Sequence, residues 1–151
     1  MKKKIDLAKK TLENGGIVIF PTETVYGLGG DATNIAAIKK IFKLKKRPFN
    51  NPLICHFNNI KAVEKNCKIK ELDKKLMKLF WPGPLTIILE KKKSSLIDPL
   101  VSNNMNFIGC RVPNNVIAKK LLKLVKFPIA APSANIATKI SSTHLLHLYK
   151  Y

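Results

Sequence analysis

Hydroxyl and carboxylate side chains follow the first apolar run of the sequence, in the stretch PTETVYGLGG at residues 21–30. Thr22, Thr24 and Tyr26 occupy alternate positions, so in an extended chain their hydroxyls point to the same side. The glycines that follow allow a ligand to approach the backbone closely. The pattern predicts a site for a small polar ligand, and a hairpin whose hydroxyls bind the local backbone explains it equally well.

Arginine is rare in this lysine-rich chain, because Arg47 and Arg111 are the only arginines among its 28 basic residues. A guanidinium binds phosphate or carboxylate through two parallel hydrogen bonds, which lysine cannot reproduce. Lys45 lies two residues before Arg47, where a predicted helix ends ahead of Pro48. This cluster indicates either a cationic clamp for a polyphosphate or lysines that complement the C-terminal end of a helix dipole.

Ser133 and Asn135 follow a buried apolar run, in the segment PSAN at residues 132–135. A hydroxyl and an amide at this spacing can bind phosphate oxygens or the water ligands of a metal, and they can equally cap a helix. The sequence contains no Gly-x-x-x-x-Gly-Lys loop, so a nucleotide would be held by other groups.

Metal binding by the histidines is not expected. His56 lies in an apolar run, where a histidine is more often satisfied by its neighbours than catalytic. His144 and His147 are three residues apart but have no third ligand nearby. The three cysteines fit neither a zinc pair nor a disulfide framework, so we expect buried thiols at Cys55, Cys67 and Cys110.

Length and charge restrict the class of protein further. The chain has 151 residues, the size of one ordinary domain, and a formal net charge of +19. Such a charge attracts polyanions such as RNA or nucleotides, although solvated lysines on helix faces explain it equally well. The apolar runs are far shorter than the roughly 20 residues of a membrane span, and the first residues lack the apolar core of a signal peptide. We therefore expect a cytoplasmic protein without a membrane partner.

Helical and strand patterns alternate along the chain, which predicts an α/β or α+β sheet covered by helices. The segment at residues 91–104 is polar and is expected to be a mobile connection. Helices are predicted at residues 5–12, 35–46, 69–81, 114–125 and in the tail at 141–151, and strands at 17–20, 52–57, 85–90, 106–113 and 127–135. Because polar segments follow several strands, these segments are expected to meet at one pocket.

Five segments in this order resemble the YrdC-like family of threonylcarbamoyl-AMP synthases. They are PTETVYGLGGDA, the Lys45 and Arg47 pair followed by NPLICHF, WPGPLTIIL, CRVPNN, and PSAN with Thr143 further on. The resemblance implies a YrdC-like twisted, open mixed sheet flanked by helices. It also implies that residues 1–151 form a single domain of this type whose C-terminal part is missing, since the family domain normally continues with further strands.

The resemblance implies that L-threonine, bicarbonate and ATP react to give threonylcarbamoyl-adenylate and pyrophosphate, for the threonylcarbamoyladenosine modification of tRNA. Lys45 and Arg47 would be the catalytic residues and would bind the ATP phosphates together with Ser133 and Asn135. Mg²⁺ would accompany ATP, and no metal site of the protein itself is implied. Attack of a carbamate oxygen on the α-phosphorus brings two anions together, so positive charge and alignment would supply most of the acceleration.

The same resemblance places L-threonine beside Thr24 and Tyr26, with His56 near the polar end of its pocket. Arg111 would contact the nucleotide or the carboxylate of the amino acid. The alternative is a non-catalytic RNA- or tRNA-binding module, or an inactive remnant of the family. Candidate partners are therefore tRNA and the proteins of tRNA modification, besides the small substrates.

Overall fold

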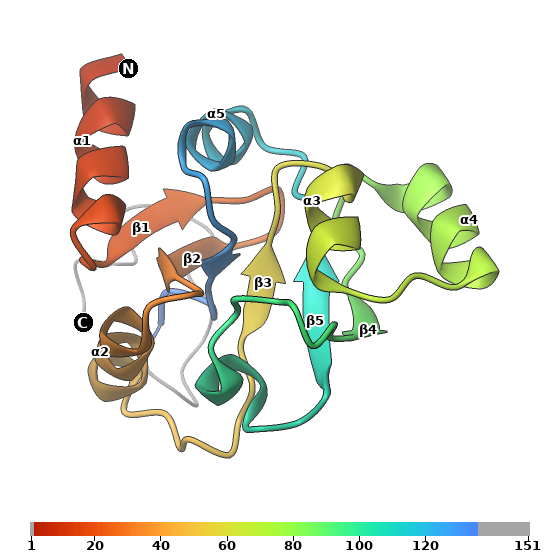
Figure 1. Ribbon diagram of the computed structural model, residues 1–151. Coiled ribbons are helices and arrows are strands. Elements are labelled where there is room, and N and C mark those ends of the chain that lie inside the picture. Colours follow the sequence, from red (N-terminus) through yellow and green to blue (C-terminus); the bar gives the residue numbers. More distant parts are fainter. Residues whose placement is uncertain (1, 136–151) are drawn as a thin grey trace.

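The computed structural model describes residues 2–135 (Figure 1). Its elements in chain order are α1 (Lys2–Glu13), β1 (Val18–Pro21), β2 (Tyr26–Asp31), α2 (Ile35–Lys45), β3 (Ile54–His56), α3 (Ile60–Asn66), α4 (Glu71–Phe80), β4 (Ile87–Glu90), the 3-10 helix η1 (Pro99–Ser102), β5 (Phe107–Arg111), α5 (Val116–Leu124) and β6 (Ile129–Ala130). The strands form one mixed sheet in the order β1-β2-β6-β3-β5-β4. Among the strands of residues 2–135, only the β3–β5 pair is parallel. The predicted fold class is confirmed.

Asparagine side chains begin three of the helices. Asn34 accepts hydrogen bonds from the amides of Ala36 and Ala37 at the start of α2, and Asn59 and Asn115 cap α3 and α5 in the same way. These caps satisfy backbone amides that the first helical turn leaves without partners. Helix α2 ends at Lys46 in the left-handed conformation, and the chain turns just before Pro48.

The two faces of the sheet bury different clusters because successive side chains of a strand point to opposite faces. Residues of α2, α3 and α4 pack on one face against Cys55 of β3 and Cys110 of β5. Helices α1 and α5 pack on the other face, against Phe20 of β1 and Ile129 of β6. They leave the part of this second face over β4 uncovered, where Ile88 is 66% exposed. The candidate site lies on this second face.

Three parts of the fold differ from the expectations, and one of them is strand β2, which was not among the predicted strands. The segment at 91–104 was expected to be a mobile connection, but it contains η1, and Ile97 and Val101 within it are buried. These two apolar side chains lie four residues apart and join the core beside α2. Helix α3 was not predicted, since it has only seven residues. The predicted tail helix at 141–151 lies outside the described residues.

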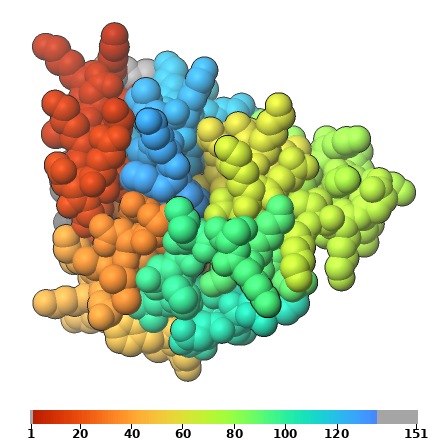
Figure 2. All heavy atoms as spheres, in the orientation of Figure 1, coloured from red at the N-terminus to blue at the C-terminus, as the bar shows by residue number. Residues whose placement is uncertain are grey.

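Helix α4 projects from the body of the molecule, at the right of Figure 2. It begins after Lys70 and ends at Trp81, whose peptide bond to Pro82 is cis. The indole Nε1 of Trp81 donates a hydrogen bond to the carbonyl oxygen of Leu85, 2.7 Å away. The WPGPLT turn therefore leads directly into β4, and it also places Gly83 beside the candidate site. Within residues 2–135 no helix has the length and apolar character needed to cross a membrane.

Candidate functional site

The stretch at residues 21–30 is a β-hairpin made by β1 and β2, with its turn at residues 22–25. The hydroxyl of Thr22 donates to the carbonyl oxygen of Val25, 2.6 Å away, and accepts from the amides of Thr24 and Val25. Hydrogen bonds with the local backbone therefore account for the hydroxyl of Thr22. The hydroxyl of Thr24 instead accepts hydrogen bonds from Arg111, which belongs to β5.

A small cavity of about 80 Å³ lies between the hairpin and the ends of β3 and β5. Five of the predicted site residues line it, namely Thr24, Tyr26, His56, Arg111 and Ser133. The parallel pairing of β3 with β5 sets His56 opposite Arg111 in the register. The segment after β6 runs beside β2, with Ser133 bridged to Gly27, and so brings Ser133 to the same place. Residues from four separate parts of the sequence therefore meet at one cavity.

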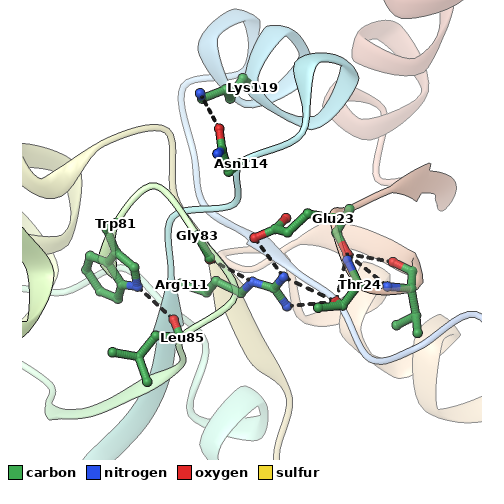
Figure 3. Close-up of polar contacts among 10 residues, drawn as sticks. Glu23, Thr24, Trp81, Gly83, Leu85, Arg111, Asn114 and Lys119 are labelled. Atoms are coloured by element: carbon green, nitrogen blue, oxygen red, sulfur yellow. Dashed lines mark hydrogen bonds and ion pairs between the residues drawn. The ribbon is translucent and has the colours of Figure 1, made fainter. Parts of the chain in front are cut away.

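The guanidinium of Arg111 is enclosed by protein acceptors (Figure 3). Its Nε donates to the carbonyl oxygen of Gly83 at 3.2 Å, and both Nη atoms donate to Thr24 Oγ1 at 3.2 Å. Its Nη2 also pairs with Glu23 Oε1 at 2.9 Å. Partial burial raises the pKa of Glu23, but hydrogen bonds from Arg111 and from the amides of Glu23 and Asn114 outweigh this effect and leave that pKa below its usual value. Glu23 is therefore ionised at neutral pH.

Lys45 is almost fully buried, with 3% of its surface exposed. Its Nζ donates to the carbonyl oxygen of Ser133 at 2.6 Å, to the carbonyl oxygen of Asn135, and to Asn135 Oδ1 at 3.0 Å. The hydroxyl of Ser133 also donates to Asn135 Oδ1. Burial, and secondly the charge of Arg47, lower the pKa of Lys45 to about 8. The structure thus joins Lys45, Ser133 and Asn135 in one hydrogen-bonded group beside the cavity.

Arg47 lies apart from the cavity lining. Its Nε donates to the carbonyl oxygen of Asn51 at 3.0 Å, and its Nη2 donates to Asn51 Oδ1 at 2.6 Å and to the carbonyl oxygen of Pro52 at 2.9 Å. These bonds hold the turn between α2 and β3 and fix the direction of the guanidinium. Partial burial lowers the pKa of Arg47, and its charge acts on Lys45. The two predicted cations are therefore neighbours, with only Lys45 bonded to a residue that lines the cavity.

The imidazole of His56 is buried and packs edge to face against Phe20, with the ring centroids 5.7 Å apart. Its Nδ1 makes no hydrogen bond among residues 2–135. Burial and the charge of Arg111 lower the pKa of His56 to about 4, so the ring is neutral at physiological pH. A neutral imidazole at this position can exchange a hydrogen bond with a bound ligand without adding charge to the cavity.

Sequence reasoning assigned no role to Glu23 or to the carbonyl of Gly83, although both bind Arg111. The available signal for Glu23 was its position beside Thr24 in a chain with nine acidic residues. No sequence signal identifies a backbone carbonyl as the partner of a distant arginine. Cys55, Cys67 and Cys110 are buried free thiols, as expected.

Comparisons with known proteins identify relatives of the chain. The family model Sua5/YciO/YrdC, described as telomere recombination, matches residues 10–151. Similar curated proteins include the threonylcarbamoyl-AMP synthases of Pyrococcus abyssi and Bacillus subtilis, at 44% and 43% identity. Each alignment covers 96% of this chain but 42% of the relative, so the chain spans less than half of their length.

A solved structure also matches the fold closely. The crystal structure of Pyrococcus abyssi Sua5 complexed with L-threonine superposes with a TM-score of 0.95 at 42% identity, covering 99% of this chain and 44% of that one. Escherichia coli YciO has the same fold, with a TM-score of 0.87 at 22% identity. The chain therefore belongs to the Sua5/YciO/YrdC family.

Proposed function

We propose that the chain carries the synthase site that forms L-threonylcarbamoyl-adenylate and pyrophosphate from L-threonine, bicarbonate and ATP, for the modification of tRNA. The observation that carries the proposal is the meeting of Thr24, Tyr26, His56, Arg111 and Ser133 around one cavity. Relatives at 43–44% identity that are named threonylcarbamoyl-AMP synthases support it. ATP and tRNA are cytoplasmic molecules, and we infer the same location for this protein.

The cavity suits the amino acid substrate. It combines the hydroxyls of Thr24 and Tyr26 with the neutral ring of His56, which are groups that bind a small polar molecule by hydrogen bonds. The related Sua5 structure was solved with L-threonine, which supports placing threonine here. In this proposal Arg111 lies at the polar end of the cavity, where its bonds to Glu23 and Thr24 fix its orientation.

The ATP phosphates would lie on the side of the cavity where Lys45, Ser133 and Asn135 form their hydrogen-bonded group. Arg47 adds a second positive charge near Lys45. Both cations are held by hydrogen bonds before any ligand arrives, and such preorganised charge stabilises a transition state in which a carbamate oxygen attacks the α-phosphorus. Mg²⁺ would arrive with ATP, bound to the phosphate oxygens.

The uncovered part of the sheet offers a place for the adenine base. Gly109 of β5 has no side chain, and Ile54, Thr86 and Ile88 surround the space above it. This floor is mostly apolar, with Gly109 itself buried and Ile88 exposed to solvent, and it continues from Arg111 along β5. A flat purine can lie against such a surface and bury apolar area on one side. The nucleotide would then extend from this floor toward Lys45.

The test is pyrophosphate release by the purified chain, measured with and without L-threonine and bicarbonate. We expect release only with both substrates and a loss of at least about tenfold for Arg47→Ala, as for the removal of one preorganised charge. Lys68→Ala is the matched control, since Lys68 pairs on the surface with Glu90, away from the cavity. Undiminished release by Arg47→Ala would contradict its proposed role, and release without threonine would contradict the proposed reaction.

The net charge of +19 favours a second candidate function, the binding of tRNA without catalysis. Lysine contacts with phosphate make such binding fall steeply as salt concentration rises. Filter binding of tRNA at several salt concentrations, beside the pyrophosphate assay, separates the two functions. Tight, salt-dependent binding with no pyrophosphate release would favour the binding module.

A further inference from the structure

Most N–H groups of the Arg111 guanidinium already donate hydrogen bonds to acceptors of the protein. A guanidinium has five N–H groups and accepts no hydrogen bond. One points to the carbonyl of Gly83, two to the hydroxyl oxygen of Thr24, and one to the carboxylate of Glu23. The ion pair is well shielded, since the side chains of Arg111 and Glu23 are 9% and 20% exposed. Arg111 is thus fixed in orientation, and its charge is balanced by a carboxylate.

The hydroxyl of Thr24 can act only as a hydrogen-bond donor toward any further partner. Its oxygen already accepts from both Nη atoms of Arg111, which occupies both lone pairs. Its neighbour, the Thr22 oxygen, is 3.1 Å away, and the hydrogen of Thr22 is used on the carbonyl of Val25 at 2.6 Å. The Thr22 oxygen also accepts from the amides of Thr24 and Val25, so the hydrogen between the two hydroxyls can come only from Thr24, as a third and weaker bond to that oxygen. A chain of hydrogen bonds runs in one direction, from Arg111 through Thr24 and Thr22 to Val25.

We propose that Glu23 is a positioning residue that orients Arg111 and thereby commits the Thr24 hydroxyl to act as a donor toward an oxygen acceptor of the substrate. This inference rests on the proposed function for the identity of the substrate. A ligand oxygen that replaces Thr22 as the acceptor receives the Thr24 hydrogen without disturbing Arg111. An ammonium group cannot bind there, because Thr24 has no lone pair to offer. The Thr24 side of the cavity therefore selects a carboxylate or carbonyl oxygen.

The carboxylate of Glu23 is suited to this task because it is charged. A hydrogen bond between two ions is about twice as strong as a neutral one, and it fixes the angle of a planar guanidinium. Without this anion, Arg111 would be a cation in a small cavity, free to turn toward any phosphate or carboxylate. Thr24 could then accept or donate. Glu23 thus sets the polarity of Thr24 through Arg111 and does not itself line the cavity.

The first experiment reads the guanidinium directly, in the ¹H–¹⁵N NMR spectrum of arginine side chains. The chain has two arginines, so two Nε–H signals are expected, and Arg47→Lys assigns them. In Glu23→Gln we expect a shifted Arg111 signal, although its Nε–H binds the carbonyl of Gly83, because the guanidinium loses the charged acceptor at Nη2 that fixes its orientation. For the same reason we expect this Nε hydrogen to exchange with water about tenfold faster. The Arg47 signal, whose Nε–H is bound by Asn51, should not move.

Glu90→Gln is the matched control for this experiment. It removes the charge of a carboxylate that is paired with Lys68 at 2.5 Å, away from the cavity. Both arginine signals should remain as in the unchanged chain. An Arg111 signal that stays the same in Glu23→Gln would overturn the proposal, whether or not the chain binds threonine.

The second experiment measures L-threonine binding by calorimetry. We expect Glu23→Gln and Thr24→Val each to weaken affinity about tenfold, as for the loss of a hydrogen bond to a charged group. Thr24→Ser keeps the hydroxyl and should bind within about twofold, and Glu23→Asp should recover part of the affinity, because each keeps the essential group. If the unchanged chain does not bind threonine, the proposed function fails and the NMR result alone decides the role of Glu23. If the chain binds threonine and Glu23→Gln binds equally well, the inference fails and the proposed function stands.

Discussion

The ammonium group of Lys45 lies 2.6 Å from the carbonyl oxygen of Ser133, although 88 residues separate the two in the sequence. This bond joins the end of α2 to the segment that follows β6. It places a buried positive charge beside a carbonyl that no other strand or helix binds in the described residues. Lys45 therefore has two tasks in the proposed site, since it holds the Ser133 segment and it supplies charge.

Lys45→Met should reduce both stability and activity. Loss of the ammonium leaves the carbonyl oxygens of Ser133 and Asn135 without this donor, which costs about 1–3 kcal/mol for a buried acceptor. Urea denaturation measures the change in the free energy of unfolding, and the pyrophosphate assay measures activity. Lys40→Met is the control, because Lys40 lies on the exposed side of the same helix and binds the carbonyl of Gly15. Equal effects of the two substitutions would contradict a special role for Lys45.

ATP affinity should fall as pH rises through about 8. Burial and the charge of Arg47 lower the pKa of Lys45 to about 8, so Lys45 loses its proton well below the usual range of a lysine. The charge that attracts phosphate is present below this pH and absent above it. Titration calorimetry with a non-hydrolysable ATP analogue between pH 7 and pH 9 tests this expectation. Lys45→Met should bind more weakly than the unchanged chain at pH 7, approach its affinity at pH 9 and lack the step, and a step that persists in this variant would assign it to another group.

Acid should destabilise the chain partly through His56. Burial and the charge of Arg111 lower the pKa of His56 to about 4 in the folded state, below the value of 6.5 in an unfolded chain. Between these values the unfolded state binds more protons, so stability falls as pH decreases through this window, by at most about 1.4 kcal/mol per pH unit. His56→Gln should show a shallower loss between pH 6.5 and pH 4.5 in urea denaturation. An unchanged slope in the variant would show that His56 is protonated at its ordinary pH.

Local patterns predicted much of this fold because they act within a few residues. The cap at Asn34, the apolar spacing of α2 and α5, and the apolar strands each leave a short-range signal, and the family resemblance ordered them into a mixed sheet. Ile97 and Val101 are two apolar residues within a polar segment, and so short a pattern does not predict burial. Their burial depends on the packing of η1 against α2, a tertiary contact that the local sequence does not encode.

The candidate site was predictable in its residue types but not in its pairings. Thr24, His56, Arg111 and Ser133 follow or end strands, and the ends of neighbouring strands meet. Which acceptor each cation binds depends on register and on the path of the loops. The pairing of Arg111 with Glu23 and the separation of Arg47 from the cavity lining therefore needed the three-dimensional structure.

Gly109→Val should weaken ATP binding and leave threonine binding intact. A Cβ at this position would lie 3.3 Å from Thr86 Cγ2, 3.5 Å from Ile54 Cγ1 and 3.7 Å from Ile88 Cδ1. The first contact is tight but involves the end of a side chain, so the strand should accommodate valine, which also favours β structure. The two added methyl groups would fill the floor where the adenine base is proposed to lie, and ATP affinity should fall on the order of tenfold or more.

The measurement is calorimetry of both ligands on Gly109→Ala and Gly109→Val, with urea denaturation as the check on folding. ATP affinity should fall less for alanine than for valine, because the obstruction grows with side-chain volume, while threonine affinity stays within about twofold for both. Gly29→Ala serves as the contrasting control. Its Cβ would come within 2.7 Å of Ile129 and Phe20 in the core, so it should lower stability by about 1–3 kcal/mol. Folded Gly109→Val with unaltered ATP affinity would place the base on a different surface, because a purine cannot occupy the volume that valine fills.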